Sequence, residues 1–150
     1  MPRAIASSGV KLHMHPQKRA MLGLNVLGGL AVLGSYYAGF AMNPESADTL
    51  WGGVPEGLMP FYTVSMLLAA VGYFPFTAFL LFRVDADRAR IAGRFGFAWF
   101  NVLYAMILIP SALWMPLTFR LIDTWSPALW VAIGIGLALV GVGSLGLLTA

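Results

Sequence analysis

The sequence contains no cysteine, which excludes disulfide bonds, thiolate catalysis and iron–sulfur clusters held by cysteine. It has only two histidines, His13 and His15, and both precede the first long apolar run. A haem held by histidine inside a membrane is therefore not expected. Two histidines alone are also too few ligands for a copper or zinc site. We predict neither a metal nor a cofactor.

Charge is also scarce: charged residues make up 10% of the chain and hydrophobic residues 59%. Four long apolar runs, at 21–41, 58–82, 97–119 and 129–149, have no Asp, Glu, Lys, Arg or His in their interiors. As a helix, each run is long enough to cross a hydrocarbon core of roughly 30 Å. The sequence therefore predicts an all-α integral membrane four-helix bundle in a single four-span domain. Short connections favour packing between helices that are adjacent in sequence.

Lys and Arg are distributed very unevenly between the connections. All but Arg120 lie before the first run or between the second and third, whereas the loop 42–57 has only acidic charges. Basic residues in short loops mark the cytoplasmic side. We predict that both termini and the middle loop are cytoplasmic, in a bacterial inner membrane or an organellar membrane. The first run is too long for a signal peptide, so we expect an uncleaved helix.

The lack of charge inside the runs bears directly on function. Proton-coupled transporters generally need an ionisable group at depth, and none is available here. The middle-loop segment RVDADRARIAGR contains Asp85 and Asp87, but it lacks the spaced aspartates of a metal-dependent phosphotransferase. An enzyme would have to rely on these carboxylates and on surface arginines and tyrosines. We predict no catalytic residue and no nucleic-acid partner.

Glycine is abundant in the first and fourth runs, where small residues four positions apart allow helix backbones to approach closely. The residues predicted to pack helices are Gly34, Gly39, Gly134, Gly136 and Gly143. Two interpretations stay open: these faces pack within the chain, or one of them binds another protein or a second copy.

Prolines interrupt the second and third runs at Pro75, Pro110 and Pro116. Proline removes a helix hydrogen bond and kinks the helix, and the freed carbonyl then needs another partner. We predict kinked second and third helices. The kinks are either architectural or mark a cavity between these helices, as broken helices do in transporters.

One polar residue in each run lies roughly 6–8 Å inside the cytoplasmic boundary at about 1.5 Å per residue; the four are Asn25, Thr77, Asn101 and Ser144. We predict that Asn25 and Asn101 face the bundle interior and share hydrogen bonds. Such a layer either holds helices together or forms a polar constriction. Ser65 and Ser111 belong to a second polar group nearer the outside, which suits either a vestibule or interfacial anchoring.

The middle loop carries four arginines that are candidates for contacts with lipid headgroups or a partner: Arg83, Arg88, Arg90 and Arg94. Setting the orientation of the chain would by itself explain them. In helical register three of them share a face with Asp87, which predicts that the second helix extends to near Gly93.

Two functions follow from these patterns. The first is a non-catalytic accessory, assembly or interaction subunit that binds another membrane protein, or itself, through glycine-rich helix faces. The alternative is a small transporter or channel for a neutral, lipidic or anionic molecule, with its cavity beside Pro75 and Pro110. Membrane lipids are partners in both cases.

Overall fold

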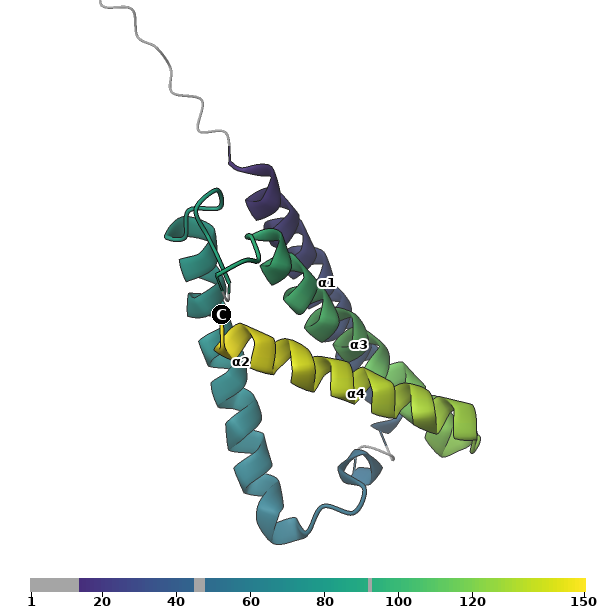
Figure 1. Ribbon diagram of the computed structural model, residues 1–150. Helices are drawn as coiled ribbons and strands as arrows, with labels where there is room; N and C mark the ends of the chain where they lie inside the picture. Colours follow the sequence, from purple (N-terminus) through teal and green to yellow (C-terminus); the bar gives the residue numbers. More distant parts are fainter. Residues whose placement is uncertain (1–13, 45–47, 92) are drawn as a thin grey trace, which may run out of the picture.

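The computed structural model describes residues 14–44, 48–91 and 93–150. Within them the chain forms α1 (Pro16–Met42), two short 3₁₀ helices, η2 (Asp48–Trp51) and η3 (Glu56–Leu58), then α2 (Met59–Phe82), α3 (Ala98–Asp123) and α4 (Pro127–Leu148) (Figure 1). All four α-helices are long and apolar enough to cross a membrane, which indicates a multi-pass membrane protein. The predicted all-α class with four spanning helices is confirmed for the described residues.

α1 extends beyond the start of its apolar run and α3 beyond the end of its run, where polar residues continue the helix. α1 begins at Pro16, because the His15 side chain caps the helix: its Nδ1 accepts a hydrogen bond from the Gln17 amide at 3.2 Å. Proline suits this first position, since its missing N–H would have no partner there. α3 likewise continues to Asp123. Hydropathy therefore located the spans, while the His15 cap sets the start of α1.

α3 lies between α1 and α4 and makes the main helix contacts of the chain (Figure 1). α1 runs alongside α3 in the same direction, with Gln17 next to Asn101 at one end and Gly39 next to Phe119 at the other. α4 returns antiparallel along α3. The expected pairing of α1 with its sequence neighbour α2 is weak. The expectation from short loops thus holds for α3 and α4 but not for α1 and α2, since α1 packs on α3 instead.

Glycines allow the close approach of α1 and α4 to α3. A Cβ added at Gly39 would collide with Met115 of α3. A Cβ added at Gly143 would lie 3.0 Å from the carbonyl oxygen of Leu103 and 2.9 Å from Cγ1 of Ile107. Both helices thus present a glycine to the central helix, as expected of membrane helices that pack through small residues.

α2 is attached to the bundle only through its C-terminal half. Thr77, Leu80 and Leu81 are buried there. Every residue from 60 to 72 is exposed, and Figure 1 shows this half of α2 diverging from the other helices. The N-terminal half of α2 therefore has no packing partner among the described residues.

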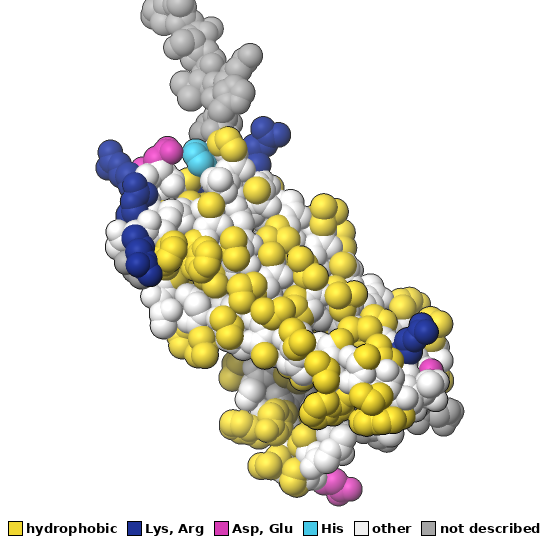
Figure 2. Space-filling model, turned by 45° about the vertical axis from the view of Figure 1, so that its right-hand side comes forward, with side chains coloured by type: hydrophobic (Ala, Val, Ile, Leu, Met, Phe, Trp, Pro, Cys, Tyr) yellow, Lys and Arg dark blue, Asp and Glu magenta, His cyan; other side chains and the backbone are white. Residues whose placement is uncertain are grey.

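Burial is concentrated at the end of the bundle where α1 and α3 begin, which we call the basic end. The largest buried cluster comprises Met21, Leu80, Leu81, Ile91, Phe97, Phe100, Tyr104 and Leu108. Figure 2 shows Lys and Arg side chains gathered at this end, with a broad hydrophobic band below them. The helices are thus packed together most tightly beside the positively charged surface.

The connection between α2 and α3 is not helical. α2 ends at Phe82, and the Asp87 amide then donates a hydrogen bond to Oδ1 of Asp85 at 3.0 Å. Such local side-chain bonds favour turns over helix. Gly93 adopts a positive φ of 73° between Ile91 and Phe95, which form an isolated β-bridge. The prediction that the second helix extends to near Gly93 was wrong.

Candidate functional site

A polar junction joins three helices near the basic end. The Tyr73 hydroxyl of α2 donates a hydrogen bond to Oδ1 of Asn25 in α1, and Nδ2 of Asn25 donates to its own helix at the Met21 carbonyl, 2.8 Å away. Thr77 Oγ1 of α2 lies 2.7 Å from the Tyr104 hydroxyl of α3. The Tyr73 and Tyr104 rings meet edge to face, with centroids 5.6 Å apart. This arrangement is favourable for aromatic rings.

Helical spacing accounts for the junction. Tyr73 and Thr77 are four residues apart on α2, so both side chains lie on the face that meets α1 and α3. Prediction from the sequence included Asn25 and Thr77 but missed Tyr73 and Tyr104. A usable signal was their spacing: Tyr73 precedes Thr77 by one turn, and Tyr104 follows Asn101 by three residues.

A second polar contact ties the starts of α1 and α3 together. Nδ2 of Asn101 donates to the Gln17 carbonyl at 3.2 Å and to Gln17 Oε1 at 2.9 Å. Oδ1 of Asn101 is buried and has no hydrogen-bond partner in the described structure. Gln17 was also missed, because it precedes the apolar run and was not considered part of a span.

The expected polar layer forms only in part. Asn25 and Asn101 are both partly buried, but they bond to Tyr73 and Gln17 rather than to one another. Ser144 is exposed. Because residues advance by about 100° around a helix, turning Gly143 toward α3 directs Ser144 away from it. The layer therefore draws on α1, α2 and α3.

The other predicted cavity residues lie apart from this junction. Ser65 is exposed on α2 and donates to its own helix at the Phe61 carbonyl, 2.8 Å away. Ser111 is half-buried on α3. Pro110 faces α4, since its Cβ is 3.4 Å from a Cβ added at Gly136. Pro75 lies inside α2. A cavity between α2 and α3 beside the prolines stays a prediction.

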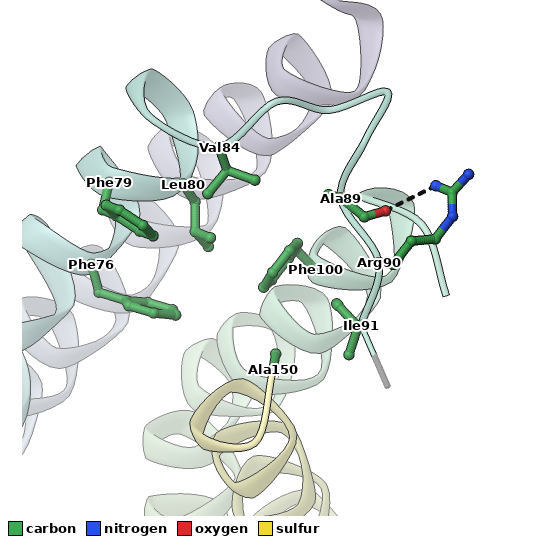
Figure 3. A pocket seen from close by; sticks show the side chains of 9 residues that line it. All are labelled: Phe76, Phe79, Leu80, Val84, Ala89, Arg90, Ile91, Phe100 and Ala150. Atoms are coloured by element: carbon green, nitrogen blue, oxygen red, sulfur yellow. Dashed lines mark hydrogen bonds between the residues drawn. The ribbon is translucent and has the colours of Figure 1, made fainter. Parts of the chain in front are cut away.

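Two cavities lie at opposite ends of the bundle. One, of about 400 Å³, lies between α1 and α3 far from the basic end and is lined by Ser35, Ala38, Gly39, Met42, Asn43, Pro116, Phe119, Arg120 and Asp123. The other, of about 200 Å³, lies at the basic end under the connection from α2 to α3 (Figure 3). Neither is lined by Pro75 or Pro110.

The four loop arginines are all exposed, and the acidic residues beside them have partners. Arg88 pairs with Asp85, with Nε 3.5 Å from Oδ2, and Asp87 lies 3.3 Å from Nε2 of His15. The Arg94 guanidinium lies 4.8 Å from the centroid of the Phe95 ring. In residues 14–44, 48–91 and 93–150 no group of three or more potential metal ligands occurs; His13 lies outside these ranges.

The glycines predicted to pack helices divide into two groups. Gly39, Gly136 and Gly143 face α3. Gly34 and Gly134 face away, and an added Cβ at either would have no atom within 4 Å. Both interpretations of the glycine faces therefore have a structural basis: one set packs the chain, and the other is available on its surface.

Comparisons with protein-family models, curated proteins and solved structures found no match to this chain. Its function must therefore be argued from the groups it presents. The junction offers amide, hydroxyl and aromatic groups, which hydrogen-bond across helices but do not change charge near neutral pH. Such groups suit helix association better than ion-coupled transport.

Replacing Tyr73 with Phe is expected to weaken the bundle only modestly, by about 0.6 kcal/mol, the average for hydrogen bonds between membrane helices. Tyr62→Phe is the matched control, since Tyr62 is exposed on the same helix. Unfolding in mixed detergent micelles, followed by circular dichroism, measures both. A loss above about 2 kcal/mol would show that the junction contributes more than ordinary interhelical bonds.

Proposed function

We propose that the chain is a non-catalytic membrane protein that acts as an accessory, assembly or interaction subunit by binding another membrane-embedded protein. The observation that carries this proposal is the N-terminal half of α2. Residues 60–72 are exposed on every side of the helix, whereas α3 is packed along its length. A partner helix would supply the contacts that the chain itself does not provide there.

The exposed half of α2 has a surface suited to a partner helix. Ser65, Ala69 and Gly72 recur at spacings of four and three residues, so they share one narrow face of small side chains. A Cβ added at Gly72 would meet no atom within 4 Å. The Ser65 hydroxyl is already bonded to its own helix, so it adds no unpaired donor. Small faces of this kind let two membrane helices approach closely.

The outward glycines of α1 and α4 support the same function. Gly34 and Gly134 lie on the faces opposite those packed on α3, among exposed leucines. They extend the small-residue surface available to a neighbouring protein beyond α2. The proposal includes a second copy of this chain as such a neighbouring protein.

Orientation is part of the proposal. Of the described basic residues only Arg120 lies at the far end of the bundle, and the others surround the basic end: Lys18, Arg19, Arg83, Arg88, Arg90 and Arg94 (Figure 2). This distribution supports a basic end, with both termini, on the cytoplasmic side of a bacterial inner membrane or on the matrix or stromal side of an organellar membrane.

A matched pair of substitutions tests the interaction. Ala69→Leu places a large side chain on the small face, and Ala70→Leu makes the same change about 100° around the helix. Both residues are exposed, so neither change disturbs the packing of the chain. Native mass spectrometry of protein extracted from its own membrane should show a stoichiometric complex in the wild type and in Ala70→Leu, and its loss in Ala69→Leu.

Photo-crosslinking gives an independent measurement. Leu68 flanks the small face and is 67% exposed, whereas Leu67 lies on the other side of the helix and is 62% exposed. A photoreactive residue should capture the partner far better at position 68 than at position 67. A monomer in the mass spectrum, with capture of lipid alone at both positions, would contradict the proposal. Solute flux through the reconstituted protein by itself would favour a transporter instead.

A further inference from the structure

The cavity at the basic end has mostly apolar walls. Phe76, Phe79 and Leu80 of α2 form one wall, and Ile91 and Phe100 form the facing wall (Figure 3). Phe76 and Phe79 are only partly covered by the chain, so this wall continues onto the lipid-facing surface of α2. A cavity of about 200 Å³ with such walls fits a segment of hydrocarbon chain rather than a polar solute.

A positively charged residue, Arg90, belongs to the lining of this cavity. Arg90 has the one charged side chain among the described lining residues, and its guanidinium points away from the apolar walls (Figure 3). A single nitrogen, Nη1, donates to the carbonyls of Ala89 and Asp87, at 3.0 and 3.4 Å. Since a guanidinium has five N–H donors, most of them stay available to an anion beside the connection.

The two acidic residues of this connection, Asp85 and Asp87, leave its four arginines in excess. Asp85 is paired with Arg88, and Asp87 lies against His15. Arg83 and Arg94 belong to the same connection and add two further cations at this end of the bundle. An apolar cavity at the end of the bundle that carries these cations is complementary to an anionic amphiphile, and less so to a zwitterionic one.

We propose that this cavity binds an anionic phospholipid, with part of one acyl chain between Phe79 and Phe100 and the phosphate on Arg90. The site is independent of the partner surface on the other half of α2. In this proposal Arg90 binds a ligand, in addition to helping to set the orientation of the chain.

Native mass spectrometry of the detergent-solubilised full chain tests the site with two lipids that share the same acyl chains, palmitoyl-oleoyl phosphatidylglycerol and palmitoyl-oleoyl phosphatidylcholine. The wild type should bind one molecule of phosphatidylglycerol with a higher affinity than one molecule of phosphatidylcholine. Arg90→Gln should lower the affinity for this phosphatidylglycerol molecule about fivefold, since one arginine near an anionic surface is worth about 1 kcal/mol. Arg120→Gln, at the far end, is the matched control and should leave it unchanged.

Filling the cavity separates an inserted lipid from one adsorbed through its headgroup alone. Ala89→Phe places a ring among the lining residues while leaving every arginine in place, and Ala70→Phe makes the same change on an exposed surface. The first should weaken phosphatidylglycerol binding and the second should not. Equal binding of the two lipids by the wild type, or undiminished binding by Ala89→Phe, would overturn the proposal. The wild-type comparison stands whether or not a variant folds.

Discussion

Tyr104→Ala is expected to cause the largest loss of stability of any single change considered for this chain. The Tyr104 side chain is 0% exposed, and its ring contacts Tyr73 while its hydroxyl pairs with Thr77. Truncating a buried aromatic residue to alanine costs about 3–5 kcal/mol. We expect a value near about 3 kcal/mol, because membrane helices lose packing contacts but little hydrophobic transfer energy on separation.

Unfolding in mixed micelles, followed by tryptophan fluorescence, measures this loss. Phe74→Ala is the control, since Phe74 is an aromatic residue of α2 that is 71% exposed. Tyr104→Phe isolates the hydroxyl and should cost only about 0.6 kcal/mol. If Tyr104→Ala were as stable as Phe74→Ala, the junction of α1, α2 and α3 would not be the centre of packing that the structure shows.

Gly143→Val is expected to weaken the contact between α3 and α4 by about 1–3 kcal/mol, the usual cost of overpacking. The added Cβ would meet the Leu103 carbonyl oxygen at 3.0 Å and Ile107 at 2.9 Å. A backbone carbonyl cannot rotate aside as a flexible side chain does, so α4 must move away from α3.

Gly141→Val provides the comparison within the same helix. A Cβ at Gly141 would have no atom within 4 Å, and the change in helix propensity is similar at both positions. The difference in unfolding free energy between the two variants therefore isolates the steric effect. Equal stabilities would mean that α4 does not pack on α3 through Gly143.

The four helices could be predicted from the sequence because each span is a long apolar run without charge. Which helices pack against each other could not be predicted. Gly34 and Gly39 both allow close packing, and only the structure shows that Gly39 meets Met115 whereas Gly34 faces outward. Glycine content identifies a helix that packs closely but not the face it uses or the helix it meets.

The polar junction was predicted incompletely for a related reason. Asn25 and Asn101 are conspicuous in apolar runs, whereas Tyr73 and Tyr104 resemble ordinary membrane aromatics until their hydroxyl partners are known. The middle loop was predicted wrongly because the spacing of its arginines fits a helix. The turn at Asp85, where a side chain competes for the backbone amide of Asp87, outweighed that pattern.

The pairing of α1 with α3 also has a consequence for how the chain is made. Synthesis proceeds from the N-terminus at roughly 5–20 residues per second, so α1 enters the bilayer seconds before its main partner exists. Until α2 is also made, Asn25 has no Tyr73 hydroxyl beside it. Its amide nitrogen bonds to the Met21 carbonyl of the same helix, which lowers the cost of waiting in lipid. α1 and α2 are thus synthesised before α3, the helix on which α1 packs in the finished bundle.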